Sequence, residues 1–195
     1  MFLLLNGCRQ HQAPVQEKGN PADVSVQKDV APSGEGTQDT DALLQAALEG
    51  RADEVHLILR TGTEVNAVDE EGHTALMFAA FNGHEAIVRE LIDLGAAVDQ
   101  RDFRGRTALL YAATGPFPET VKLLLDHGAD PNQVDSDEHF SPLMHAAAEG
   151  HLEVVRVLLG YGADPALKDV DGDDAESFAR QAGHLDVADY LTERH

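Results

Sequence analysis

From residue 41 onward, apolar residues recur in short groups that are separated by glycines. Residues 74–80 read TALMFAA, and after Gly83 a second apolar group that includes Leu91 and Ile92 ends at Gly95. Apolar residues three and four positions apart favour short amphipathic helices. A glycine suits the end of each helix because it adopts positive φ readily. The pattern therefore predicts two short helices packed back to back around a shared apolar face.

The same pattern returns at an almost constant period. Its opening phrase reads TALMFAA from Thr74, TALLYAA from Thr107, SPLMHAA from Ser141 and DAESFAR from Asp174, so successive copies begin 33, 34 and 33 residues apart. A period of this length indicates a stacked array in which each repeat buries its apolar face against its neighbours. The four opening residues are all good helix N-caps, since their side-chain oxygens can accept from free amides of the first turn.

These repeats resemble ankyrin repeats, whose first helix opens with Thr-Pro-Leu-His-x-Ala-Ala and is followed by Gly-His and later by Gly-Ala-Asp. Pro142 matches the family's proline, whereas Met77, Leu110 and Met144 stand in place of its histidine. This exchange is expected to weaken a hydrogen bond in the turn and to leave the core unchanged. The resemblance implies an all-α ankyrin repeat solenoid of about five helix pairs with β-turn fingers, preceded by a disordered N-terminal segment.

Three segments follow from the pattern. Residues 1–8 form a segment similar to a lipoprotein signal, residues 9–40 a disordered linker, and residues 41–195 the repeat domain. The linker contains Pro14, Pro21 and Pro32 and few large apolar residues, so it cannot bury enough surface to offset its ordering entropy. A tether is favoured, and a segment that folds on a partner is the alternative. The repeat domain divides into an N-terminal cap (41–73), three repeats (74–106, 107–140 and 141–173) and a C-terminal cap (174–195).

The residues around Cys8 carry a second resemblance. Leu5, Asn6, Gly7 and Cys8 are similar to the lipobox of bacterial lipoproteins, in which the cysteine is lipidated after signal cleavage. No Lys or Arg precedes the short apolar run, and a start codon further upstream would supply a normal signal. Such lipoproteins tend to stay at the inner membrane when Asp follows the cysteine, so Arg9 implies the periplasmic face of the outer membrane. The alternative is a chance match in a cytosolic adaptor or inhibitor.

Composition narrows the function. The chain has 35 acidic and 14 basic residues and a formal net charge of −21, which disfavours nucleic-acid binding because phosphates are repelled. Cys8 is the single cysteine, so an intramolecular disulfide and a CxxC metal or redox motif are excluded. No apolar run approaches the length of a membrane-spanning helix. These features leave a membrane contact only through a lipid on Cys8.

Motifs of catalysis and of metal binding are also missing from the sequence. It contains no nucleophile elbow, Walker A loop or His-Glu-x-x-His motif. The acidic run 169–174 has its glycine at the fourth position, whereas a calcium-binding EF-hand loop needs it at the sixth. Asp169 and Gly172 instead belong to columns shared with other repeats, and the histidines show no zinc-ligand spacing. We therefore expect a non-catalytic monomer with no cofactor and no metal.

Two loops depart from the repeat pattern. Residues 114–118 place two prolines at the turn between helices, and Phe117 is expected to pack against that turn rather than to be displayed. Residues 135–140 form an acidic loop that is one residue longer than its equivalents and lacks the glycine found at 72, 105 and 172. This loop is the best single candidate for a partner contact. A tolerated surface insertion is the alternative, because lengthening a loop costs little free energy.

The ankyrin resemblance implies a protein partner of unknown identity, bound by the fingertips and by the exposed ends of the first helices along a concave groove. One finger is basic and the others are acidic, so a partner of mixed charge is expected, and an ordinary solvated acidic surface is the alternative. The candidate partner-binding residues are Phe81, Asn82, Arg101, Phe103, Arg104, Thr114, Asp137, Glu138, His139, Phe140 and Glu149.

Overall fold

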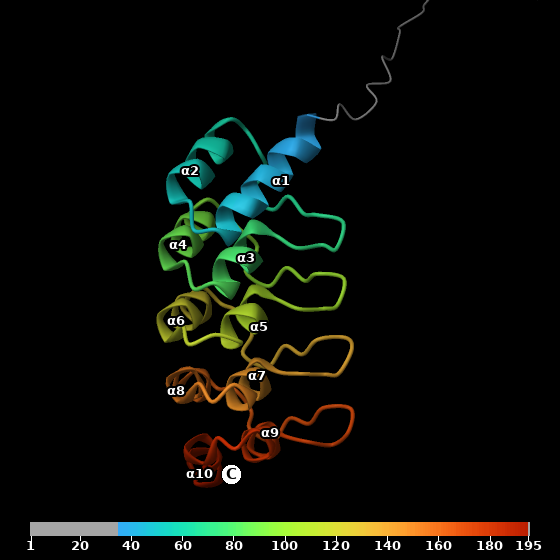
Figure 1. Ribbon diagram of the computed structural model, residues 1–195, viewed down its shortest axis with the longest axis vertical. Coiled ribbons are helices and arrows are strands. Elements are labelled where there is room, and N and C mark those ends of the chain that lie inside the picture. Colours follow the sequence, from blue (N-terminus) through green and yellow to red (C-terminus); the bar gives the residue numbers. More distant parts are fainter. Residues whose placement is uncertain (1–34, 195) are drawn as a thin grey trace, which may run out of the picture. The chain divides into compact units, whose positions relative to one another are not determined.

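The computed structural model describes residues 35–194, and in this part of the chain ten α-helices stack as five successive pairs (Figure 1). The all-α repeat architecture is confirmed. The helices are α1 (Glu35–Leu48), α2 (Ala52–Arg60), α3 (Ala75–Phe81), α4 (Glu85–Asp93), α5 (Ala108–Ala113), α6 (Pro118–Asp126), α7 (Pro142–Ala148), α8 (Leu152–Gly160), α9 (Ala175–Ala182) and α10 (Leu185–Thr192).

The helices form two rows. The odd-numbered helices make the first row, the even-numbered helices make the second, and the long loops project from the far side of the first row (Figure 1). One leucine of the opening phrase, such as Leu76 or Leu109, is fully buried in the first row, and Leu91 and Leu124 face it from the second. Each such side chain contributes about 1.5–3 kcal/mol relative to exposure. Because neighbouring pairs share this core, no pair is complete alone.

Each of the first-row helices α3, α5, α7 and α9 begins at the N-cap that the sequence predicts. The side-chain oxygens of Thr74, Thr107, Ser141 and Asp174 accept from the amide three residues later, at 3.3, 3.4, 3.2 and 3.0 Å. In α3 the Met77 sulfur in turn accepts from the Thr74 amide at 3.4 Å. Methionine at this position therefore keeps a weak acceptor for the amide of the capping residue.

Phe117 packs as expected. It is the N-cap of α6, the place that His84 and His151 hold in α4 and α8. A Cβ on Gly83 of the preceding repeat would lie 2.3 Å from the Phe117 ring. Gly83, which has φ of 67°, is therefore needed both for its backbone conformation and for the close approach of this ring.

The start of the array differs from the prediction. Helix α1 begins at Glu35 rather than at Asp41, so the last six residues of the expected linker, 35–40, are helical. No proline follows Pro32 until Pro116, and the helix can therefore extend back toward that proline. The lipobox at residues 5–8 and the rest of the expected linker lie outside the described residues. None of the described helices has the length and apolar character that crossing a bilayer requires.

Candidate functional site

Four loops, here called fingers 1 to 4, project from the array at residues 69–73, 101–106, 135–140 and 169–173. Each finger is organised by one aspartate whose carboxylate accepts two backbone amides of the same loop. This observation confirms that Asp169 has the same structural role in its repeat as Asp69 and Asp102 have in theirs. The bonds are Asp69 with Glu71 and His73 (3.0 and 2.8 Å), Asp102 with Arg104 and Arg106 (both 2.9 Å), Asp135 with Glu138 and Phe140 (3.0 and 3.2 Å), and Asp169 with Asp171 and Asp173 (3.0 and 2.8 Å).

Backbone hydrogen bonds also join each finger to the next. The Phe103 amide donates to the Glu71 carbonyl at 3.0 Å, and the Ser136 amide donates to the Arg104 carbonyl at 2.7 Å. The Val170 amide donates to the Glu138 carbonyl at 3.1 Å. The four fingers therefore form a continuous structure, which we call the finger ladder, rather than four independent loops.

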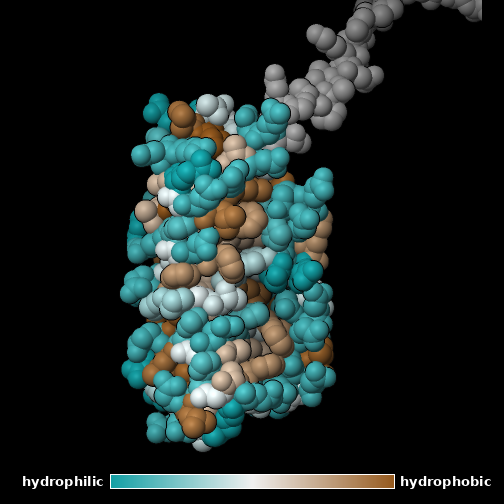
Figure 2. All heavy atoms as spheres, in the orientation of Figure 1, coloured by the Kyte–Doolittle hydropathy of each residue, from teal (hydrophilic) through white to brown (hydrophobic). Residues whose placement is uncertain are grey.

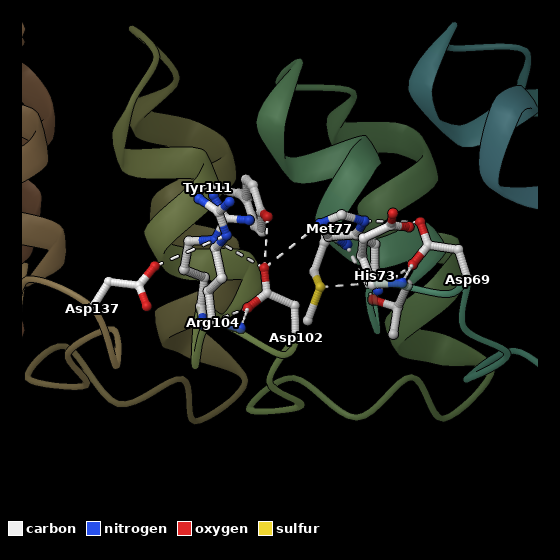
Figure 3. A network of polar contacts seen from close by, with 10 residues as sticks. Asp69, His73, Met77, Asp102, Arg104, Tyr111 and Asp137 are labelled. Carbon is white, nitrogen blue, oxygen red and sulfur yellow. Dashed lines mark hydrogen bonds and ion pairs between the residues drawn. The ribbon is translucent and has the colours of Figure 1, made fainter. Parts of the chain in front are cut away.

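A polar network fastens fingers 1 and 2 to helix α5 (Figure 3). Its centre is Asp102, which is 5% exposed and accepts from the Tyr111 hydroxyl at 2.7 Å and from the Arg106 Nε at 2.9 Å. The Arg106 guanidinium also lies 4.7 Å from the centroid of the Tyr111 ring. On the other side, the His73 ring lies between Asp69, 2.8 Å from Nδ1, and Asp102, 3.6 Å from Nε2.

The charge states in this network follow from its hydrogen bonds. Burial acts to raise the pKa of Asp102, but the Arg106 amide, the Tyr111 hydroxyl and the Arg106 guanidinium outweigh it, and the pKa lies below its ordinary value. Burial and the bond to Asp102 raise the pKa of Tyr111. The carboxylate is therefore ionised and the phenol neutral around pH 7, as their hydrogen bond requires. This arrangement holds the finger in place.

Two exposed aromatic side chains mark the surface beside this network. Phe103 at the tip of finger 2 is 78% exposed, although its ring lies against Gly72 of finger 1, where an added Cβ would come within 3.0 Å. Phe81 at the end of α3 is 44% exposed, and its ring centroid lies 6.1 Å from that of Tyr111. Exposed aromatic side chains of this size are typical of the anchors of protein interfaces.

A hollow of about 320 Å³ opens between fingers 1 and 2. On the face of the array drawn in Figure 2, hydrophilic residues cover the two margins, and neutral and hydrophobic residues gather between them. A polar rim around a less polar centre is the usual composition of an interface. The hollow is lined by Glu71, His73, Asp102, Phe103, Arg104 and Arg106.

Most of the candidate residues lie on the surface. Asn82 is exposed and donates to the Leu48 carbonyl of the preceding repeat at 2.7 Å, and Arg101 donates to the Gln133 side chain. Thr114 is half-buried. The structure thus brings some of the candidates into contacts within the array, while the exposed set remains accessible to a partner. That set comprises Phe81, Asn82, Arg101, Phe103, Arg104, Asp137, Glu138, His139 and Glu149.

Phe140, one of the candidate partner-binding residues, packs within the array. It is half-buried, and its ring centroid lies 4.9 Å from that of Phe178 in α9 and 5.4 Å from that of His145 in α7. The extra residue of finger 3 is accommodated at His139, which adopts φ of 60° where other fingers have glycine. Phe140 therefore packs between adjacent repeats, and the exposed part of finger 3 is polar.

Asp69, Glu71 and His73 form a group of three metal-ligating side chains in the described part of the chain, with ligand atoms within 4.8 Å of one another. Two backbone amides already occupy Asp69 Oδ1, and His73 Nδ1 lies 2.8 Å from Asp69 Oδ2. Hydrogen bonds within the finger therefore explain why Asp69 and His73 lie close together.

The bond between Asp102 and Tyr111 was not predicted from the sequence. The recurrence of aspartate at 69, 102, 135 and 169 was the available signal for the organising role of these residues. Comparison with protein families gives a match to a model described as ankyrin repeats (three copies), over residues 43–135 and 118–195. No curated protein matches the chain significantly.

Proposed function

Because the chain belongs to the ankyrin repeat family, whose repeats indicate protein–protein interaction, we propose that its array docks a protein partner without catalysing a reaction. The docking surface is the exposed edge of the first-row helices together with the finger ladder. The observation that supports this role most strongly is the exposure of Phe103 at a fingertip held by backbone bonds on both sides. An apolar ring in such a place loses contact with water only when another molecule covers it.

The neighbours of Phe103 support the same role. Arg101 and Arg104 are exposed beside it, and arginine and aromatic residues are the types most enriched at the energetic centres of interfaces. The ankyrin family is typically non-catalytic, and the polar network around Asp102 has a structural explanation. A binding module accounts for these features with fewer assumptions than an enzyme does.

Recovery of a partner tests this proposal. Wild-type chain, Phe103→Ala and Leu57→Ala are used as baits, because Leu57 is also exposed but lies on second-row helix α2. We expect wild type and Leu57→Ala to recover the same protein and Phe103→Ala to recover much less of it. Equal recovery by all three baits would remove the fingertip from the proposal, and no recovery by wild type would remove the docking role.

We further propose that Cys8 carries a lipid that anchors the array in the cell envelope, facing the periplasm. The support is the lipobox-like sequence from Leu5 to Cys8. Radiolabelled palmitate and mass spectrometry of the native protein test the anchor. Label on wild type but not on Cys8→Ala, with loss of residues 1–7, supports it. An intact chain without lipid would favour a cytosolic adaptor or inhibitor instead.

A further inference from the structure

The exposed charges of finger 2 are opposite in sign to those of the other three fingers. Finger 1 exposes Glu70 and Glu71, finger 2 exposes Arg101 and Arg104, finger 3 exposes Asp137 and Glu138, and finger 4 exposes Asp171. The organising aspartates do not alter this order, since their carboxylates are turned onto backbone amides of their own fingers. A partner lying along the finger ladder therefore meets negative, positive, negative and negative fingers in turn.

Two arginines of finger 2 are exposed: Arg101 donates to the Gln133 side chain, and Arg104 is only loosely paired. Arg104 Nε lies 3.9 Å from the nearest Asp137 oxygen, and the two side chains are 67% and 55% exposed (Figure 3). An exposed pair of this kind contributes little to stability, so Arg104 can exchange Asp137 for another carboxylate at small cost. Arg106, by contrast, is held by Asp102 and Tyr111.

Beside these arginines, the hollow between fingers 1 and 2 offers a place for one apolar side chain. Phe103, His73 and Arg104 are among the residues that line it. An aromatic or large aliphatic group placed there would cover the face of Phe103 that water now contacts. Burial of apolar area of this kind is the main favourable term in most protein association.

From this arrangement we propose the chemistry of the partner, an inference that rests on the proposed docking function. The partner presents a short segment in which an aromatic or large aliphatic residue adjoins an acidic residue, with Lys or Arg on both sides. The acidic residue pairs with Arg101 and Arg104, the apolar side chain covers Phe103, and the flanking cations meet fingers 1 and 3. A wholly acidic segment is disfavoured by the net charge of −21.

Two synthetic peptides of identical composition separate charge order from net charge. The ordered peptide is Lys-Lys-Gly-Gly-Phe-Asp-Asp-Gly-Gly-Lys-Lys, and the scrambled peptide is Asp-Lys-Lys-Gly-Gly-Phe-Gly-Gly-Lys-Lys-Asp. Fluorescence polarisation against the full chain measures both. We expect the ordered peptide to bind at least about tenfold more tightly at low salt. We expect this advantage to shrink as salt is raised, because exposed charges are screened.

The variants follow from the same geometry. Arg101→Ala combined with Arg104→Ala should bring the ordered peptide down to the affinity of the scrambled one, and Phe103→Ala should weaken both peptides. Asp171→Asn on finger 4 is the control that keeps the preference. Thermal melts confirm that each variant is folded, since all four residues are exposed.

Equal binding of the two peptides to wild type, or a preference that survives the double arginine substitution, would overturn the proposed charge order. The docking function is judged separately. If wild type recovers a partner that Phe103→Ala loses, docking at the fingertip stands even when the peptides show no preference. If wild type recovers nothing, the docking function itself fails.

Discussion

The Tyr111 hydroxyl donates a hydrogen bond of 2.7 Å to the Asp102 carboxylate, and this contact joins the base of finger 2 to helix α5. The carboxylate is almost fully buried and accepts in addition from the amides of Arg104 and Arg106. A change at Asp102 therefore leaves several donors without a charged acceptor. The position of finger 2, which carries Phe103, therefore depends on this side chain as well as on the backbone bonds to fingers 1 and 3.

Replacing this carboxylate by an amide tests that dependence. We expect Asp102→Asn to lower the free energy of unfolding by about 2–3 kcal/mol, because hydrogen bonds to a charged group are lost and a buried donor is left unsatisfied. Urea denaturation measures the change. Asp171→Asn removes the same charge from an exposed place on finger 4 and should alter stability by less than about 0.5 kcal/mol.

The dependence of the free energy of unfolding on pH in acid should also reveal the contribution of Asp102. Because folding lowers the pKa of Asp102 below its ordinary value of 3.8, its contribution is fully present above that value. The contribution is lost as the pH falls through the folded-state pKa. Urea titrations below about pH 4 should therefore show a shallower loss in Asp102→Asn than in wild type. Parallel acid limbs in the two proteins would argue against an ionised, bonded Asp102.

His145 should make stability depend on pH at a higher range. Burial lowers the pKa of His145 below its ordinary value of 6.5, with Asp135 opposing and Arg106 adding to the effect. Below its ordinary pKa the His145 side chain therefore binds a proton more readily in the unfolded chain than in the folded chain. The free energy of unfolding should be highest above pH 6.5 and should fall as the pH drops below that value. Phe78 and Phe178 hold the same position in other repeats, so phenylalanine should fit here. We expect the melting temperature of His145→Phe to depend less on pH in this range than that of wild type.

Phe103 and Phe140 should separate binding from folding. Phe140→Ala removes a half-buried ring packed on Phe178 and should cost about 2–3 kcal/mol, somewhat less than for a fully buried ring. Phe103→Ala should change stability by less than about 0.5 kcal/mol. Urea denaturation compares the two variants with wild type. A large destabilisation by Phe103→Ala would show that the fingertip ring has a structural role.

The contact of Phe117 with Gly83 can be measured against a matched glycine. Gly83 and Gly128 both have positive φ, but an added Cβ meets Phe117 at 2.3 Å in the first case and nothing within 4 Å in the second. Gly83→Ala should therefore be more destabilising than Gly128→Ala by about 1–3 kcal/mol, the cost of overpacking. In urea denaturation, Gly83→Ala should lower the free energy of unfolding less in a Phe117→Ala background than in wild type. If the effects of the two substitutions simply add, the contact is contradicted.

A buried charge should unfold the array as one unit. Leu125 in α6 is 6% exposed, and Leu125→Asp should destabilise by on the order of 4 kcal/mol through an unpaired buried carboxylate. Gly95→Val should cost less, about 1–3 kcal/mol, because only its φ of 90° is strained and the space around it is open. Circular-dichroism melts should show one cooperative transition at a lower temperature in both, and an unchanged midpoint would contradict the shared core.

The features that the sequence predicted correctly are those determined by local chemistry repeated at one period. Thr74, Thr107 and Ser141 are N-caps as expected, because capping depends on a side chain and on an amide three residues away. Gly95 adopts positive φ as expected, because the end of a helix favours it. Recurrence of the same residue types in each repeat made these predictions secure.

Two of the features that were missed depend on contacts between residues that are distant in the sequence. The bond from the Phe103 amide to the Glu71 carbonyl joins two fingers and has no pattern in either one. The direction of the Phe140 ring depends on Phe178 in the next repeat, which local spacing does not reveal. The start of α1 at Glu35 was missed for a local reason, because residues 35–40 contain no large apolar residue that would show a helical period.

The finger ladder has a consequence for the energetics of recognition. Isolated loops would lose conformational entropy when a partner immobilises them, and that loss reduces affinity. Here the amides of Phe103, Ser136 and Val170 already tie every finger to its neighbour. The finger ladder is thus preorganised, and a partner that matches its spacing can bind without the entropic cost of immobilising four independent loops.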